Sequence, residues 1–454
     1  MKRKTINLVA LGWWLILAVM TVFLKDPASS EPYKDGINLL GILIIVHGIY
    51  AFYRHGGRYI TPTGVFMLTS VIVGGFAALY LNNFEGFFMV EGHYLATLIV
   101  FVSQLCVYYL FSNTPISLGH HLVEPAVRIQ FSDDLTRWVF LVAILTAAGG
   151  SVIFYTIPSL SLFQAPAVYV SIIMIAIALF RDENKKVRVS SLLFVLFLFF
   201  IYYFWLFSGF GRIDLATLVF GLLISVHKRL FKNLVKTMIA VAALPSVIAA
   251  SLLRGGDLSD LDGGIGSVVS PHYRFGQLIE LYQDGLLQLQ WGKTIWAAAV
   301  TPVPRAIWPE KPWNFNREIT YIFNPEYVIY GHSEAAVLYA EWLFNFGFAG
   351  ILFCVVFLGV LLKWLDRKYF SLLFKSSWSS GDFIKFTVVV IMMGGMLNLY
   401  WGGFSTFMAR EGIRLMVLGT VLACLIIYVP VKRKHIIIEE VKHESISHHS
   451  RVQR

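Results

Sequence analysis

Arginines stand beside carboxylates in two short segments of this sequence, around Arg212 and Asp214 and again at Arg410, Glu411 and Arg414. A guanidinium grips two phosphate oxygens at once and stays charged at any physiological pH. A carboxylate beside it accepts a proton or orients the arginine. Such segments indicate a site for an anionic, phosphate-bearing ligand. The competing interpretation is structural, namely ion pairs at helix ends or arginines that reach lipid headgroups.

A second group of polar residues lies between these two segments. Three of its members are basic and three can transfer a proton: Arg274, Arg305, Lys311, His332, Glu334 and Glu341. Glu334 and Glu341 are seven residues apart, so both fall on one face of a helix. Glu341 is open to two interpretations, a proton-transferring base or a buried structural acid.

Nothing in the sequence indicates a nucleotide, a metal ion or another cofactor. The phosphate-binding pattern GxxxxGK[ST] is absent, and no GxGxxG follows a strand pattern. Cys106, Cys354 and Cys424 lie in apolar segments, away from other Cys or His at metal-ligand spacing. We therefore expect no cofactor and chemistry that needs no metal.

The elements that position these residues are apolar helices. The chain has 454 residues, of which 57% are hydrophobic and only 14% charged, whereas globular proteins have about 25% charged residues. The apolar residues come in blocks of about 20, the length with which a helix crosses roughly 30 Å of hydrocarbon. This composition excludes a soluble enzyme, a disordered chain and a coiled coil, and it predicts an all-α, polytopic integral membrane protein.

Hydropathy predicts about 12 transmembrane helices. They cover residues 6–24, 37–53, 63–82, 94–113, 138–157, 164–180, 189–208, 213–226, 234–253, 335–362, 384–402 and 413–431. The chain then divides into helices 1–6 (1–188), helices 7–9 (189–253), a large outer loop (254–333), helices 10–12 (334–431) and a basic tail (432–454).

Basic residues predict how these helices are oriented, because Lys and Arg accumulate in cytoplasmic loops. If the chain starts in the cytoplasm and the helices alternate, 26 of the 37 Lys and Arg residues fall on the inner side. The sequence therefore predicts that both termini are cytoplasmic and that residues 254–333 lie outside. The net charge of +10 follows from this asymmetry, so the expected partner is the lipid bilayer and not a nucleic acid.

The large outer loop is predicted to be folded. An amphipathic pattern runs from Phe275 to Leu289 and favours a helix that lies on the outer membrane surface. Residues 294–303 form an apolar stretch that is too short to span a membrane and that Pro302 and Pro304 end. We interpret it as an interfacial or re-entrant segment.

Five short motifs follow one another along the second half of the chain. They are Gly209-Phe210-Gly211-Arg212, Gly292-Lys293-Thr294 after Arg274, Pro304-Arg305-Ala306-Ile307-Trp308-Pro309-Glu310-Lys311-Pro312, Glu341-Trp342-Leu343-Phe344-Asn345-Phe346-Gly347, and Ala409-Arg410-Glu411-Gly412. In this order they resemble the Wzy-type oligosaccharide repeat unit polymerases, the O-antigen polymerase family. The resemblance covers roughly residues 190–430, and the earlier helices match only in hydrophobicity and number.

This resemblance implies a GT-C-like polymerase of lipid-linked glycans in the bacterial inner membrane. Such an enzyme joins oligosaccharide repeat units at the outer membrane face, with the lipid diphosphate as leaving group. Its donor and its acceptor are both undecaprenyl-diphosphate-linked oligosaccharides, and its product is an O-antigen, a capsule or an exopolysaccharide. A chain-length regulator and a repeat-unit flippase are the protein partners that the resemblance implies.

Glycosyl transfer of this kind requires that the departing diphosphate is stabilised and that the acceptor hydroxyl loses a proton. The expected diphosphate ligands are first Arg212, Arg305 and Arg410, then Arg274 and Arg414, with Lys311 as a weaker point charge. The candidates for the general base are Glu341, Glu334, His332, Glu411 and Asp214. Of these, Glu411 is more typical of an orienting partner because it adjoins Arg410.

Two other functions remain open. An O-antigen ligase uses the same kind of donor and has a large outer loop, but it transfers glycan to the lipid A core; the Trp-Pro-Glu-Lys-Pro block favours the polymerase. A transporter or flippase of a lipid-linked or anionic substrate would also place charges among its spans. The first six predicted helices hold almost no interior charge, which favours a catalytic face on one side of the membrane.

Overall fold

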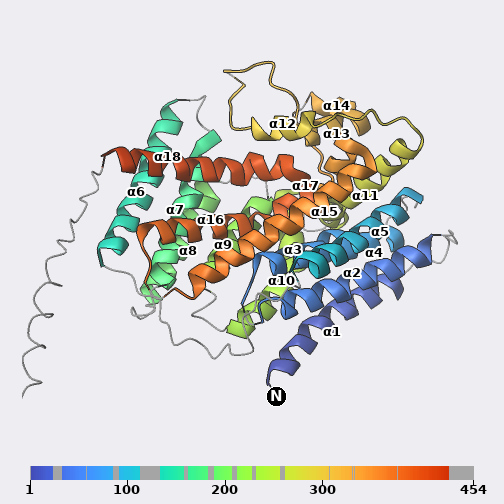
Figure 1. Cartoon of the computed structure of the whole chain (residues 1–454), viewed down its shortest axis with the longest axis horizontal. Coiled ribbons are helices and arrows are strands. Elements are labelled where there is room, and N and C mark those ends of the chain that lie inside the picture. Colours follow the sequence, from blue (N-terminus) through green and yellow to red (C-terminus); the bar gives the residue numbers. More distant parts are fainter. Residues whose placement is uncertain are drawn as a thin grey trace, which may run out of the picture.

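The computed structural model describes residues 2–23, 33–57, 59–84, 91–112, 133–157, 162–181, 189–206, 212–226, 232–255, 261–305, 307–329, 331, 333–375 and 377–428. Throughout these ranges the chain folds into helices joined by turns, without a strand (Figure 1). The all-α class that the composition predicts is confirmed.

Within these ranges, six helices are long and apolar enough to cross a membrane. They are α2 (Lys34–Arg54), the continuous helix α3–η1–α4 (Pro62–Asn83), α5 with η2 (Glu91–Ser112), α6 (Asp133–Thr156), α7 (Gln164–Arg181) and α15 (Leu338–Leu373). A seventh is added if α16 (Ser380–Gly394) and the helix Met396–Ala423, which meet at a bend of 82°, form one span. The chain therefore has the fold of a helical membrane protein.

Twelve membrane crossings remain a prediction, because in four of the described helices the apolar stretch is shorter than 18 residues. These stretches are Leu8–Val22 of α1 (Lys2–Phe23), Val189–Phe204 of α8 with η4 (Val189–Leu206), Asp214–Ser225 of α9 (Arg212–Val226) and Leu234–Ser246 of α10 (Lys232–Gly255).

The predicted boundary between the last two spans is wrong. The chain turns at Gly395 and continues as α17 (Met396–Phe407), η5 (Met408–Gly412) and α18 (Ile413–Tyr428), interrupted by a kink at Gly402 and Gly403. Hydropathy indicates a loop at 403–412 because Arg410 and Glu411 interrupt the apolar run there. In the structure these two charges have partners inside the helix bundle, so the helix has no need to leave it.

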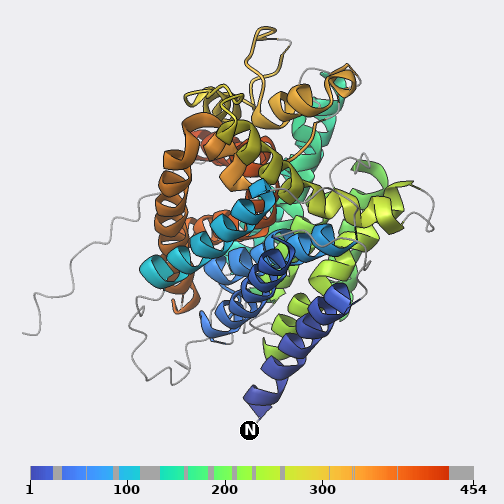
Figure 2. The same ribbon diagram turned by 90° about the vertical axis from the view of Figure 1, so that its right-hand side faces the viewer.

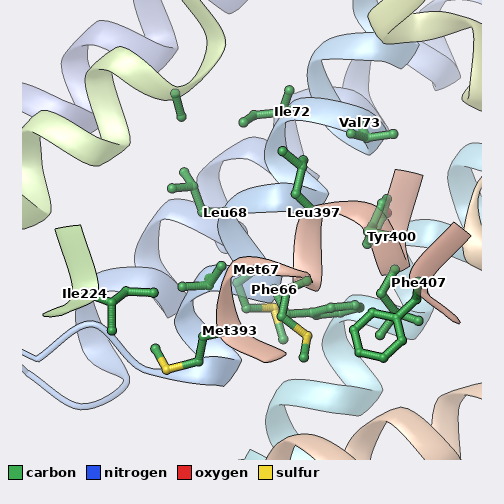
Figure 3. Close-up of a cluster of buried hydrophobic side chains, with 14 of the residues drawn as sticks. Phe66, Met67, Leu68, Ile72, Val73, Ile224, Met393, Leu397, Tyr400 and Phe407 are labelled. Atoms are coloured by element: carbon green, nitrogen blue, oxygen red, sulfur yellow. The ribbon is translucent and has the colours of Figure 1, made fainter. Parts of the chain in front are cut away.

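A buried apolar core fixes the position of α17 (Figure 3). The helix α3–η1–α4 is buried along its whole candidate span, and α17 packs against it. Phe66 of α3 lies 5.4 Å from Tyr400 of α17, measured between ring centroids, and Met67 and Leu397 belong to the same cluster. Close packing of these side chains holds helices together where the surrounding lipid is as apolar as the core, so α17 has one well-defined place in the bundle.

The long helix α15 is broken at Gly347, where φ is 65° and ψ is −157°. The break leaves the preceding carbonyls without helical donors. One of them, Asn345 O, accepts a hydrogen bond from Trp291 N. Trp291 lies two residues before α12 (Lys293–Ala299). Only glycine suits the break, since φ is positive and a Cβ would lie 2.6 Å from the Tyr282 hydroxyl. The 26 residues of α15 after the break extend about 39 Å at 1.5 Å per residue, which alone exceeds the roughly 30 Å of a hydrocarbon core.

The helices of the predicted outer loop gather at one end of the molecule, and the start of α1 lies toward the other end (Figures 1 and 2). They are α11 (Leu261–Gln283), α12, α13 (Phe315–Phe323) and α14 (Pro325–Val328). The apolar stretch 294–303 forms the short helix α12 and a turn.

The amphipathic helix predicted from Phe275 is present, but its environment differs from the prediction. It is the second half of α11, it ends at Gln283, and Leu286 and Leu289 lie beyond it. Its apolar face packs against α5 and α15, where Phe275 is fully buried. Because protein already covers this face, the prediction that it lies on the membrane surface is wrong.

Candidate functional site

Two of the predicted charged segments, about two hundred positions apart in the sequence, meet in the bundle. Asp214 lies in the first turn of α9, and Arg414 in that of α18. Arg414 Nη2 lies 3.0 Å from Asp214 Oδ1, and Arg414 Nη1 lies 2.6 Å from Glu411 Oε1. Arg410 Nε lies 3.4 Å from the same Asp214 oxygen. These residues, together with Asn398, form what we call the arginine–carboxylate centre.

Asn398 of α17 connects the two arginine-bearing turns and was missed by sequence reasoning. Its side-chain oxygen accepts a hydrogen bond from Arg410 Nη1 at 2.5 Å, and its amide nitrogen donates to both oxygens of Glu411, at 2.9 and 3.1 Å. The only available signal was a single amide inside an apolar segment, where a polar side chain needs a partner.

The arginine–carboxylate centre has a buried and an accessible layer. The side chains of Arg414 and Glu411 are 3% and 0% exposed, whereas those of Arg410 and Asp214 are each 22% exposed. Arg414 also donates to Thr217 Oγ1 at 3.2 Å and lies 3.7 Å from the centroid of the Tyr169 ring. Arg414 and Glu411 are therefore closed off from a ligand, whereas Arg410 and Asp214 are partly accessible.

The accessible pair, Arg410 and Asp214, suits the two requirements of a group-transfer step, which are a cation for the leaving group and an acceptor for the proton. Both arginines contact Asp214 through Oδ1, so within the described part of the chain no arginine occupies its second oxygen. That oxygen can accept a proton, while Arg410 presents a planar cation beside it. Among the described side chains of the centre, the two arginines balance the two carboxylates in charge.

Glu341, fully buried in the first turn of α15, caps the break in α17. Its Oε2 accepts hydrogen bonds from Phe404 N and Ser405 N at 2.5 and 3.2 Å, and its Oε1 accepts one from Ser405 Oγ at 2.5 Å. The break lies at Gly403, so these N–H groups begin a new helical segment and lack helical acceptors. Both oxygens of Glu341 are occupied, and the carboxylate fixes the segment that leads to Arg410.

A second ion pair lies among the outer helices. Arg274 Nε lies 2.6 Å from Glu334 Oε2, and the guanidinium lies 4.8 Å from the centroid of the Phe323 ring. Asn324 donates to Glu334 Oε1, and Glu334 N donates to Thr320 Oγ1 at 2.7 Å. Both charged side chains are partly exposed, so this pair is accessible as well.

Helix α13 connects the second ion pair to the break in α17. Thr320 accepts a hydrogen bond from Glu334 N near the end of α13. The first turn of the same helix binds α17, where Asn316 Nδ2 donates to Thr406 Oγ1 at 2.7 Å. Phe315 N donates to Ser405 Oγ at 3.2 Å. The outer helices are therefore anchored on the same segment that Glu341 caps.

Arg305 and Lys311 lie in the loop between α12 and α13, which projects from the end of the molecule (Figure 2). Lys311 Nζ donates to the carbonyls of Thr301 and Val303 at 3.0 and 2.8 Å, and partial burial, followed by the charge of Arg305, lowers the pKa of its ammonium group. Arg305 is exposed and donates to Pro309 O at 3.0 Å. In this structure, Lys311 holds the loop in shape and Arg305 is free to turn toward a ligand.

Two of the sequence candidates cannot be placed. Arg212 is the first residue of α9, but its side chain lies outside the described part of the structure, and so does His332. Among the residues that are described, no group of three or more His, Cys, Asp or Glu side chains is placed to hold a metal ion. Chemistry without a metal or a cofactor stays a prediction.

Comparisons of this chain with protein-family models, with curated proteins and with solved structures give no match. The resemblance of the five sequence motifs to a polymerase family therefore stays a hypothesis that rests on the motifs themselves.

Proposed function

We propose that this chain is a polymerase of lipid-linked glycans, which transfers a growing glycan from undecaprenyl diphosphate to a hydroxyl of the next lipid-linked repeat unit. The observation that carries the proposal is the accessible pair Arg410 and Asp214, held by buried partners in a helical membrane protein. An arginine suits the diphosphate, and the adjacent carboxylate suits the acceptor hydroxyl.

In the proposed step, the acceptor hydroxyl oxygen attacks the anomeric carbon of the donor glycan. The bond from that carbon to the diphosphate oxygen breaks, and the lipid diphosphate leaves with its electron pair. The hydroxyl proton passes to Asp214. Arg410 donates N–H groups to the departing diphosphate, where negative charge grows during the reaction. Among the described carboxylates, Asp214 is our first choice for the base because both oxygens of Glu341, Glu411 and Glu334 are engaged by hydrogen-bond or ion-pair partners.

The buried residues of the centre act by orienting Arg410. Asn398 holds one guanidinium nitrogen and is itself fixed by Glu411. Glu411 in turn binds the buried Arg414. A donor group that is already aimed at the site of charge development needs no reorganisation during the reaction.

The proposed orientation places this chemistry at the outer face of the bacterial inner membrane, with both termini in the cytoplasm. The excess of Lys and Arg in the predicted inner segments supports this orientation. The start of α1 and the outer helices also lie toward opposite ends of the molecule (Figure 1), as the proposal requires.

One observation favours a second candidate, a transporter of a lipid-linked or anionic substrate. The helices α15 and α17 are discontinuous at Gly347 and Gly403, and discontinuous helices with polar groups at the break are typical of transporter binding sites. Here, however, the breaks are filled by Glu341 and by the loop before α12.

The test is to purify the full-length protein in detergent and supply undecaprenyl-diphosphate-linked repeat units from a strain that lacks the gene. A polymerase produces a ladder of lengthened glycans on a gel without any membrane gradient. No lengthening in detergent, combined with substrate movement in sealed vesicles, would establish the transporter instead. In cells, loss of the gene should collapse the surface glycan to one repeat unit; accumulation of unattached lipid-linked polymer would indicate a ligase.

A further inference from the structure

Trp291 has an unusual backbone conformation. Its φ is 49°, and among the described residues it is the one non-glycine residue with a positive φ. A bulky side chain rarely adopts this left-handed conformation, because its Cβ comes too close to the following carbonyl. Such strain persists only where neighbouring contacts enforce it, and it is often found at functional positions.

Contacts from α15 enforce the strained turn. Gln290 N donates to Phe344 O at 3.1 Å, and Trp291 N donates to Asn345 O at 3.0 Å. Gly292 N donates to the side-chain oxygen of Asn345, also at 3.0 Å. The turn thus uses carbonyls that the break at Gly347 sets free, and its position is fixed relative to α15.

This strain is not compensated by burial of the indole ring. Trp291 is 77% exposed, so the turn presents a large flat apolar surface from a backbone position that is fixed. A second exposed indole, Trp296, lies on the following helix α12. In a protein whose turn had only to connect two segments, glycine or asparagine at this position would avoid the strain.

Polar residues flank Trp291 in the sequence, and the helix that follows leads toward the arginine–carboxylate centre. Gln288 and Lys293 are exposed, Gln290 is partly exposed, and the Lys293 ammonium group pairs with Glu318 at 3.1 Å. Helix α12, which starts two residues after Trp291, packs against η5, the segment that carries Arg410. The turn that carries Trp291 is therefore close in the fold to the proposed reacting centre.

We infer that Trp291 is a sugar-binding platform, on which a pyranose ring of the glycan stacks while the flanking amide and ammonium groups bind its hydroxyls. The C–H face of a pyranose is apolar and flat, and its edge carries hydroxyls, which matches an exposed indole flanked in the sequence by polar residues. A bilayer-anchoring tryptophan would not need a strained backbone conformation. The inference deepens the proposed function, on which it rests for the choice of glycan as ligand.

The test uses the full-length protein in lipid nanodiscs and, as probe, the lipid-free oligosaccharide released by mild acid from the surface polymer of cells that carry the gene. Trp291→Asn removes the ring and relieves the backbone, since asparagine tolerates positive φ. We expect its affinity for the probe to fall about tenfold or more, with an apparent Tm equal to or above that of the wild type. Trp291→Phe should keep most of the affinity, because it keeps an aromatic face.

Leu286→Asn is the matched control, since Leu286 is 72% exposed in the same loop but has no aromatic ring; it should bind the probe like the wild type. Equal affinity of Trp291→Asn and wild type would overturn the inference. Stronger quenching of the wild type than of Trp291→Asn by acyl-chain nitroxide lipids would also overturn it, because the ring would then lie in the bilayer.

Binding of the lipid-free probe does not depend on the diphosphate chemistry. A chain that binds the probe through Trp291 but makes no polymer would leave this inference standing and remove the polymerase. A chain that makes normal polymer and binds the probe equally well without the indole would overturn this inference and leave the proposed polymerase standing.

Discussion

Glu341 and Gly403 approach so closely that a Cβ built on Gly403 would lie 2.4 Å from Glu341 Oε2. The approach joins α15 to the break in α17, and it lets the carboxylate reach the first N–H groups of the segment that continues to Arg410. Gly403 has a φ of 73°, so it is needed both for its backbone conformation and for its missing side chain.

The first prediction is that Gly403→Ala lowers the free energy of unfolding by about 2 kcal/mol or more, since it adds a clash to the strain of positive φ. The apparent Tm of the purified protein should fall accordingly. Gly57→Ala is the matched control, because φ is also positive there, at 59°, and nothing lies within 4 Å of the added Cβ. It should cost only the strain, about 1 kcal/mol. Equal losses in the two variants would contradict a special role for the contact.

The second prediction separates a capping role of Glu341 from a catalytic one. Glu341→Gln keeps an oxygen that accepts from Phe404 N and Ser405 N, so glycan length should stay near that of the wild type. Glu341→Ala leaves those buried donors without an acceptor and should lower stability by about 1–3 kcal/mol. Ladder length on gels and apparent Tm measure the two effects. Complete loss of polymer in a well-folded Glu341→Gln protein would make Glu341 the base.

The sequence predicted the residue types of the site well, but not their roles. It selected Asp214, Arg410, Glu411 and Arg414, and the structure brings all four together. The sequence could not show which arginine side chains are buried, because burial depends on which helices pack around each arginine. The order in which the arginines were expected to bind diphosphate therefore did not take burial into account. Arg414 lies over Tyr169 and is buried, a contact between helices far apart in the chain that no local pattern encodes.

The same limit applies to the fold. Apolar runs predicted most helices, because a run of this length has few alternatives in a membrane. Hydropathy averages over a window, so it reported Arg410 and Glu411 as a loop and overlooked the turn at Gly395. It also assigned the apolar face of α11 to lipid, whereas α5 and α15 cover that face.

The third prediction concerns orientation. A reporter enzyme that is active only outside the cytoplasm should give signal when it is fused after Asp284, which follows α11, and none when it is fused after Lys434 in the basic tail. The two fusions control each other, provided that both are expressed at the same level. The reverse pattern would place the arginine–carboxylate centre on the wrong side for an outer-face reaction.

The fourth prediction is that polymer formation by the purified protein continues in EDTA. The proposed step stabilises the leaving diphosphate with guanidinium groups, so it needs no divalent cation. Ladder length should be unchanged with and without added Mg²⁺. Loss of the ladder in EDTA and its recovery with Mg²⁺ would show that a metal ion, and not Arg410 alone, stabilises the leaving diphosphate.

The fifth prediction contrasts Arg410 with Arg414. Arg410→Lys keeps the charge but loses the planar fork, so polymerisation should slow by about 10²–10³-fold, the loss typical of a donor to a developing anion, while apparent Tm stays near that of the wild type. Arg414→Lys loses buried contacts with Asp214 and Tyr169, so its main effect should be a lower apparent Tm. The exposed Arg54, at the end of α2, is the control, and Arg54→Lys should change neither quantity. Full-length ladders from a stable Arg410→Lys protein would exclude Arg410 as the diphosphate ligand.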